Sequence, residues 1–94
     1  MAHREHQRIR EAILEHRYAL TEHAYHEMAD DSLDVLDVES AILTGEVERT
    51  LTHDPRGRRY VVVGTATDLE TAVGVVLRFA GNDEVLIITV YEIK

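Results

Sequence analysis

The sequence contains no cysteine and no tryptophan, and it has a single proline and a single lysine. Without cysteine the chain can form neither disulfide bonds nor thiolate metal sites, and it has no thiol nucleophile, which favours a reducing compartment. Its longest apolar stretches lie within residues 60–64 and 85–90 and are far shorter than the ~20 residues that cross a bilayer. The first residues are polar and lack the apolar segment of a secretory signal. We therefore expect a cytoplasmic protein with no membrane partner.

Positive charge is also scarce, because 10 Lys and Arg stand against 18 Asp and Glu and give a formal net charge of −8. Such a surface repels polyanions and disfavours unspecific binding of nucleic acid. The charge is uneven, since residues 22–48 contain nine acids and no Lys or Arg, whereas Arg56, Arg58 and Arg59 stand close together. Contact with a polyanion is therefore expected only where arginines gather.

The first half of the chain has the apolar spacing of amphipathic helices. The pattern predicts helices over residues 3–17 and 22–30, and a third that begins after Asp34 and ends before Gly45. Thr21 and Asp34 are suitable N-cap residues, and Gly45 stands where a left-handed C-cap is needed. The apolar residues expected to face inward are Ile9, Ala12, Ile13, Ala24, Met28, Val35, Val38, Ala41 and Ile42.

After Gly45 the apolar period changes to two, which predicts strands over residues 46–52, 59–67, 71–79 and 85–92. The connections between them are short and polar, so the strands should form an antiparallel meander. No internal repeat or linker divides the 94 residues, so helices and sheet should share one core. The predicted fold is α+β, a single domain over residues 1–94 with three N-terminal helices on one face of a four-stranded antiparallel sheet.

Alternation along the strands assigns each side chain to one face of the sheet. The expected inward residues are Val61, Val63, Val73, Val75, Leu77, Phe79, Leu86, Ile88 and Val90. The expected outward residues are Tyr60, Val62, Gly64, Val76, Arg78, Ile87, Thr89 and Tyr91. Because Val62, Val76 and Ile87 would form an apolar patch on that outward face, we expect the face to be covered, most simply by a second copy in a homodimer.

No motif for a metal or a cofactor stands out. His23, His26 and Glu27 share a helix face through their i, i+3 and i+4 spacing, but there is no H-E-x-x-H pattern and no distant third ligand. The pattern favours an ordinary charged helix surface. There is also no Gly-rich phosphate loop, dinucleotide fingerprint or G-x-S-x-G elbow. We expect neither a metal nor a cofactor.

Several segments, taken in order, resemble a family of small prokaryotic proteins known only as a domain of unknown function. They are residues 21–24 (Thr-Glu-His-Ala) with Met28, residues 41–47, residues 54–57 (Asp-Pro-Arg-Gly), residues 60–64 and residues 87–92. The resemblance extends from about Ile9 to the end of the sequence. It implies a RelE-like fold related to the MqsR-type toxins, which cleave messenger RNA, either free or on the ribosome, and pair with an antitoxin protein.

The resemblance also implies a site. Ribonucleases that use no metal need a group that transfers protons and cations that stabilise the phosphorane. His23 is the histidine of the family motif and would be the general acid or base, with Arg78 and Tyr91 as the other catalytic residues. The substrate-binding residues would be Arg58, Arg59, Tyr60 and Thr89. Family members usually carry Arg just before the methionine of the motif, where this sequence has Glu27.

Each of these residues also has a structural interpretation. His23 can hold its helix to the sheet through a hydrogen bond, Arg58 and Arg59 can belong to a solvated hairpin, and aromatic residues are common in sheets. Two functions therefore stay open. The first is a toxin-like endoribonuclease, with a site that Glu27 could have degraded. The alternative is a non-catalytic interaction or dimerisation module of the same fold, which the acidic composition favours.

Overall fold

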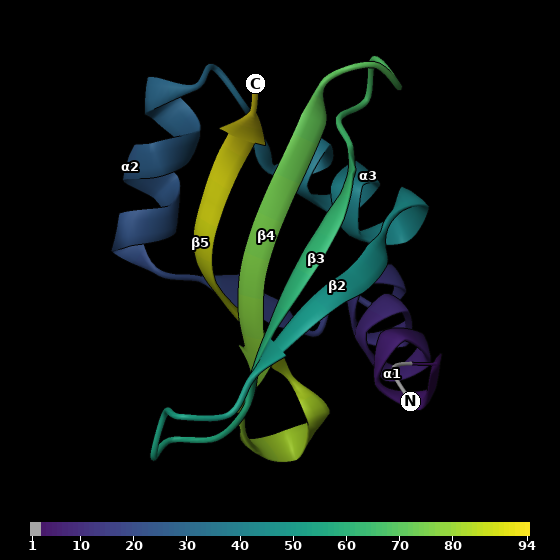
Figure 1. Ribbon diagram of the computed structural model, residues 1–94, viewed down its shortest axis with the longest axis vertical. Helices are drawn as coiled ribbons and strands as arrows, with labels where there is room; N and C mark the ends of the chain where they lie inside the picture. Colours follow the sequence, from purple (N-terminus) through teal and green to yellow (C-terminus); the bar gives the residue numbers. More distant parts are fainter. Residues whose placement is uncertain (1–2) are drawn as a thin grey trace.

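The structure is a computed structural model that describes residues 3–94 and contains three helices and a five-stranded sheet (Figure 1). The helices are α1 (His3–Leu14), α2 (Glu22–Asp30) and α3 (Val35–Thr44), and a 3-10 turn, η1 (Gly81–Asp83), precedes the last strand. The strands are β1 (Tyr18–Leu20), β2 (Glu46–Leu51), β3 (Arg59–Thr65), β4 (Ala72–Phe79) and β5 (Val85–Ile93). The predicted α+β class and the three helices are confirmed.

The sheet has the strand order β1-β5-β4-β3-β2 and is mixed, because β1 runs parallel to β5 while the other neighbours are antiparallel. The prediction of a four-stranded antiparallel sheet is therefore wrong in detail. The additional strand β1 has only three residues, too few for alternation to reveal it. Figure 1 shows α1 and α3 behind the sheet and α2 beside β5, so that no helix of the described chain crosses the front of the sheet.

Helix α1 ends at Leu14, three residues before the helix end predicted at Arg17. It ends there because His16 adopts a left-handed conformation with φ of 57°. The backbone N–H groups of His16 and Arg17 then donate to the carbonyls of Ile13 and Ala12, which is the Schellman pattern of a helix end. Ser32 ends α2 in the same conformation. The left-handed cap predicted at Gly45 is wrong, since Gly45 is extended with φ of −95°.

The predicted N-caps of the second and third helices are confirmed. The Thr21 hydroxyl accepts a hydrogen bond from the Ala24 N–H at 3.1 Å and also donates to the Ile88 carbonyl, which joins α2 to β5. Asp34 and Asp37 form a reciprocal capping box at the start of α3. Asp37 further accepts hydrogen bonds from the backbone N–H and the hydroxyl of Thr67, and these bonds lower the pKa of Asp37.

The core lies between the helices and the sheet. Most of the predicted inward residues are buried there, including Ile9, Ile13, Met28, Val38, Ile42, Val73, Val75 and Leu77. The prediction for residues 59–67 is reversed, because Tyr60 and Val62 belong to this core whereas Val61 and Val63 point away from the helices. Four consecutive apolar residues, Tyr60-Val61-Val62-Val63, leave alternation without a signal.

In β5 the predicted faces are wrong up to and including Ile88, and they are right after it. The register passes from the pair Val76 with Thr89 to the pair Leu77 with Ile87, so Ile88 forms a bulge. A bulge inserts one residue and reverses the alternation of the strand. Val85, Ile87 and Val90 are consequently buried in the core, whereas Leu86 and Ile88 are only half-buried. The predicted apolar patch of Val62, Val76 and Ile87 does not exist as a unit, because two of its members are core residues.

The contact between α3 and β3 depends on glycine. A side chain at Gly64 would meet the carbonyl group of Ala41, and one at Gly45 would meet the carbonyls of Val63 and Ala41. Only glycine permits two backbones to approach this closely. The face of β3 that contains Gly64 must therefore lie against α3, which places Val61 and Val63 on the opposite face. None of the helices formed by residues 3–94 is long and apolar enough to cross a membrane.

Candidate functional site

The outer face is defined here as the side of the sheet turned away from the helices, which is the front in Figure 1. The strand register aligns Arg49, Val61, Val76 and Thr89 in one row across this face. A second row, closer to the upper end of the sheet in Figure 1, contains Glu46, Val63, Gly74 and Tyr91. The predicted outward position of Thr89 and Tyr91 is confirmed.

Two more arginines occupy the lower end of the outer face. Tyr60 of β3 is paired with Leu77 of β4, and both side chains point to the core. Arg59 and Arg78 are their neighbours along the two strands, one position closer to the lower end of the sheet. Alternation places both arginines on the outer face. Arg49, Arg59 and Arg78 therefore lie on one surface with Thr89, and we call these four residues the arginine cluster. It gathers positive charge in a chain whose net charge is −8.

Sequence reasoning missed Arg49, although strand 46–52 was expected. Strict alternation would place Arg49 on the same face as the inward Val47, but the register shifts between these two residues. The bulge at Glu48 turns Arg49 to the outer face. The signal that could have found it is the polar run Glu46 to Thr50 around a single valine, which is typical of an edge strand with a bulge.

Arg49 and Arg78 are not engaged with acidic groups. No ion pair formed by residues 4–94 includes either of them. Arg78 is half-buried and donates from Nη1 to the Phe79 carbonyl at 3.4 Å. Arg49 is exposed on the edge strand β2. Both guanidinium groups are thus available to an anionic ligand.

Arg59 has an internal partner in the loop between β2 and β3. Its Nε and Nη2 atoms both lie 2.7 Å from Oδ2 of Asp54. The other carboxylate oxygen of Asp54 accepts from the backbone N–H of Arg56 at 2.9 Å and from its Nε at 3.2 Å. These bonds, with that of the Arg56 N–H first, lower the pKa of Asp54 to about 2. Arg58 lies in the same loop and is exposed.

Tyr91 lies across Gly74 on the outer face. A side chain at Gly74 would collide with the ring and the hydroxyl group of Tyr91, so the ring occupies the space that a side chain would fill. Tyr91 is half-buried in this position. An aromatic ring on a sheet beside arginines is a surface on which nucleic-acid bases can stack.

Tyr60 is not on this surface. It is 6% exposed, and its ring meets that of Phe79 edge-on with centroids 5.8 Å apart. The Arg8 guanidinium lies 4.1 Å above the Phe79 centroid on the helix side. Tyr60 therefore packs in the core as part of an aromatic cluster with Phe79 and Arg8. Its expected outward orientation is wrong.

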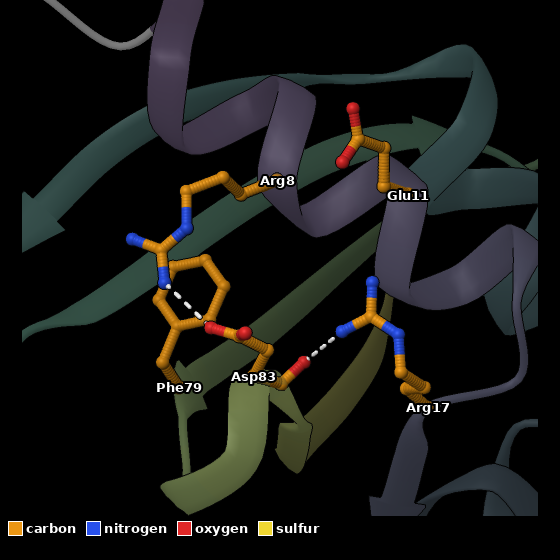
Figure 2. Close-up of a pocket in the computed structure, with 5 residues that line it drawn as sticks. All are labelled: Arg8, Glu11, Arg17, Phe79 and Asp83. Atoms are coloured by element: carbon orange, nitrogen blue, oxygen red, sulfur yellow. Dashed lines mark hydrogen bonds and ion pairs between the residues drawn. The ribbon is translucent and has the colours of Figure 1, made fainter.

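This aromatic cluster borders a small pocket of about 150 Å³ (Figure 2). Arg8 forms an ion pair with the Asp83 carboxylate at 3.6 Å, and Arg17 donates from Nη1 to the Asp83 carbonyl. Figure 2 shows both arginines reaching from the α1 side towards the same residue of the η1 turn. The two positive charges of Arg8 and Arg17 are balanced by the two negative charges of Glu11 and Asp83 in the same pocket. The pocket therefore connects α1 to the η1 turn and offers no excess charge to a ligand.

His23 is placed elsewhere. It is exposed on α2, and its Nε2 lies 3.2 Å from Oε1 of Glu27. Glu27 in turn accepts a hydrogen bond from the Val90 N–H of β5. No ion pair or hydrogen bond within residues 4–94 joins His23 to Arg58, Arg59 or Arg78. Figure 1 shows α2 beside β5, whereas the β2–β3 loop extends beyond the lower end of the sheet.

The histidines of α2 do not assemble a metal site. His26 Nε2 lies 3.6 Å from a carboxylate oxygen of Glu22, so each histidine pairs with a different glutamate one turn away. Across the described part of the chain no three His, Asp or Glu side chains are arranged to hold a metal ion.

Comparison with known proteins gives one match. A family model described as "Domain of unknown function (DUF4258)" matches residues 20–92, which extend from the last residue of β1 into β5. No curated protein and no solved structure matches the chain.

Proposed function

Since the chain belongs to the DUF4258 family of domains of unknown function, we propose that it is a RelE-like protein whose outer sheet face binds single-stranded RNA and cleaves it. The observation that supports this most strongly is the arginine cluster of Arg49, Arg59, Arg78 and Thr89 on one face of an acidic chain. A RelE-like fold, messenger RNA or the ribosome as target and an antitoxin as partner belong to the same proposal, and they rest on the motifs in residues 21–28 and 87–92.

The chemistry of the outer face suits an RNA backbone. Guanidinium groups match phosphate oxygens through two parallel hydrogen bonds and remain charged at every physiological pH. Arg49 and Arg78 have no internal acidic partner within residues 4–94 to displace. The Tyr91 ring, held across Gly74, offers a flat surface to a base, and the Thr89 hydroxyl can donate to or accept from a ribose.

The proposed reaction is transesterification within the RNA. The ribose 2′-oxygen attacks the adjacent phosphorus, the bond from phosphorus to the 5′-oxygen breaks, and the products are a 2′,3′-cyclic phosphate and a 5′-hydroxyl. The 2′-hydroxyl loses its proton to a base, and the 5′-oxygen gains one. Arg59 and Arg78 would stabilise the extra negative charge of the phosphorane. Two side chains are candidates for the general acid or base, Tyr91 on the outer face and His23 of the family motif.

Binding is tested by fluorescence anisotropy with a labelled single-stranded RNA. Arg78→Gln and Arg49→Gln should each weaken binding about 3–10-fold and reduce the salt dependence by about 0.7 in slope per lost contact. Arg10→Gln is the matched control, because Arg10 is an exposed arginine on α1 and should change nothing specific to the sheet face. Wild-type protein that binds no RNA, or variants that bind as well as Arg10→Gln, would overturn the proposal.

Cleavage is tested by following the same RNA on denaturing gels, with and without ribosomes. Tyr91→Phe and His23→Ala should separate the two proton-transfer candidates, since loss of a general acid or base lowers the rate about 10²–10⁴-fold. RNA that stays intact under all conditions while it is still bound would leave a binding protein without catalysis and overturn the catalytic part of the proposal.

One observation favours the alternative of a non-catalytic interaction module. The upper outer face carries Val63 and Tyr91, both half-buried, and Ile93, which is 39% exposed. This apolar surface fits a second copy of the chain or an antitoxin. Sedimentation would support it by showing a dimer that Val63→Asp dissociates, in a protein that binds no RNA.

A further inference from the structure

A wide, open hollow lies on the surface of the hairpin that joins β2 and β3. It has a volume of about 440 Å³ and is lined by Leu51, His53, Asp54, Pro55, Arg56 and Arg59. The pocket beside Arg8 and another beside His16 measure about 150 and 160 Å³. We call the larger cavity the hairpin hollow. Its volume is large enough for a phosphate together with the nucleoside attached to it.

Asp54 binds two of the arginines that line the hairpin hollow. Its Oδ2 binds the Nε and Nη2 atoms of Arg59, and its Oδ1 binds the Nε of Arg56. These contacts leave Nη1 of Arg59 and both Nη atoms of Arg56 for a ligand. The Asp54 side chain is only 9% exposed whereas that of Arg56 is 69% exposed, so the carboxylate is covered and the Arg56 guanidinium stays open to a ligand.

The charge and the walls of the hairpin hollow define its ligand. Two arginines against one carboxylate leave a net positive charge, and the imidazole of His53 adds a hydrogen-bond donor. Leu51 and Pro55 supply apolar wall, and Leu51 is partly exposed at 36%. A phosphate with an attached nucleoside combines the anion and the flat apolar group that such a lining accepts.

We infer that the hairpin hollow is a nucleotide subsite, in which Arg56, Arg59 and His53 bind the phosphate and Leu51 and Pro55 contact the nucleoside. The inference rests on the proposed function and deepens it. Arg59 belongs both to the arginine cluster and to the hairpin hollow, so an RNA strand bound on the outer face leads into the hollow at the lower end of the sheet. The subsite would hold one nucleotide of that strand.

The direct test uses nuclear magnetic resonance of the full chain titrated with uridine 3′-monophosphate and, separately, with inorganic phosphate. Saturable shifts confined to residues 51–59 and to the His53 ring are expected, with the nucleotide binding more tightly than phosphate alone. Arg56→Gln and His53→Gln should each weaken nucleotide binding about 3–10-fold, as loss of one ordinary, solvent-exposed hydrogen bond does. Arg10→Gln should leave it unchanged. Both loop residues are exposed, so the fold should survive, and circular dichroism checks that it does.

The outcomes separate the two proposals. If neither probe shifts residues 51–59, or if Arg56→Gln and His53→Gln bind nucleotide as the wild type does, the subsite is refuted while Arg78→Gln still tests the outer face. If the nucleotide binds in the hairpin hollow but the protein binds no RNA, the proposed function fails and the hollow stands as a site for free nucleotides. If RNA binding falls in Arg78→Gln and in Arg56→Gln alike, both proposals are supported.

Discussion

Glu27 on α2 accepts a hydrogen bond from the backbone N–H of Val90 on β5, with 3.1 Å between Oε1 and the nitrogen. Strand β1 pairs only with residues Val85–Ile87, so the rest of that edge of β5 has no strand beside it. Helix α2 and its flanking residues supply the missing partners, since Asp31 accepts from the Glu92 N–H and Thr21 donates to the Ile88 carbonyl. The arginine that family members usually carry at position 27 could not accept a hydrogen bond from the Val90 N–H. Glu27 therefore contributes to the stability of the fold in this chain.

Glu27→Ala should lower the free energy of unfolding by about 1–3 kcal/mol, because it leaves the Val90 N–H without its charged acceptor. Glu27→Gln keeps an acceptor oxygen and should lose less than half as much. Glu22→Ala, at a side chain of the same helix that is 91% exposed, is the control and should change stability by about 0.5 kcal/mol or less. Urea denaturation measures all three, and equal losses in Glu27→Ala and Glu22→Ala would contradict the role given to Glu27.

Because of the bulge at Ile88, Ile87 rather than Leu86 faces the core, so the two residues contribute differently to the free energy of unfolding. Ile87 is fully buried in the core and Leu86 is half-buried on the outer face. Ile87→Ala should therefore lower the free energy of unfolding by about 2–5 kcal/mol, and Leu86→Ala by less than half of that. Thermal or urea denaturation decides, and a larger effect at Leu86 would mean that the strand has no bulge.

The sequence predicted the elements that have a regular spacing of apolar residues or a recognisable capping residue. Thr21 and Asp34 identified two helix starts, and the spacing of Val38, Ala41 and Ile42 identified a buried helix face. The strand faces were predicted correctly in all of β4 and, in β5, only after the bulge at Ile88. In β3 four successive apolar residues erase the alternation, and in β2 and β5 a bulge reverses it. A bulge depends on contacts with other strands, and only in β2 does a polar run around a single valine indicate it.

Gly64→Ala should be destabilising by about 1–3 kcal/mol or more, since the added methyl group meets the backbone carbonyl of Ala41, which cannot rotate away. Gly81→Ala is the matched control, because a side chain there meets nothing within 4 Å. Its stability should stay within about 0.5 kcal/mol of the wild type. Denaturation curves of the two variants that coincide would show that α3 and β3 are not in close contact.

Tyr18 should make stability fall at high pH. Burial first, and then its hydrogen bond to Glu39, raise the pKa of Tyr18 from 10.0 to about 12. Because the folded state holds this proton more tightly than the unfolded state, its contribution is complete below pH 10 and is lost as the pH rises through about 12. Denaturation over this range should give a steeper decline in the wild type than in Tyr18→Phe. Tyr25→Phe, at an exposed tyrosine, removes only the smallest cause of the raised Tyr18 pKa, the charge of Tyr25, and should keep most of the wild-type slope.

The candidate site was predictable only as a set of residue types. Arg59, Arg78, Thr89 and Tyr91 were singled out as residues for RNA, and the structure places them on one face because β3, β4 and β5 are adjacent. Arg49 was hidden by the β2 bulge. His53 was hidden because the hairpin hollow is formed by a loop, and the sequence contains no period that tells which loop side chains converge. The prediction of His23 as a catalytic residue rests on the family motif alone, and in the structure its neighbour is Glu27 on α2.

The position of β5 between β1 and β4 also bears on how the chain acquires its shape during synthesis. Strand β1 and helix α2 leave the ribosome early, yet the groups they bond to belong to residues 85–92. A nascent chain that stops short of β5 can pair β2 with β3 and β4, but it has no docking place for residues 18–31. Contacts of such long sequence separation form slowly. Residues 18–31 should therefore become protected from proteases only once β5 is in place, although they are translated before β2, β3 and β4.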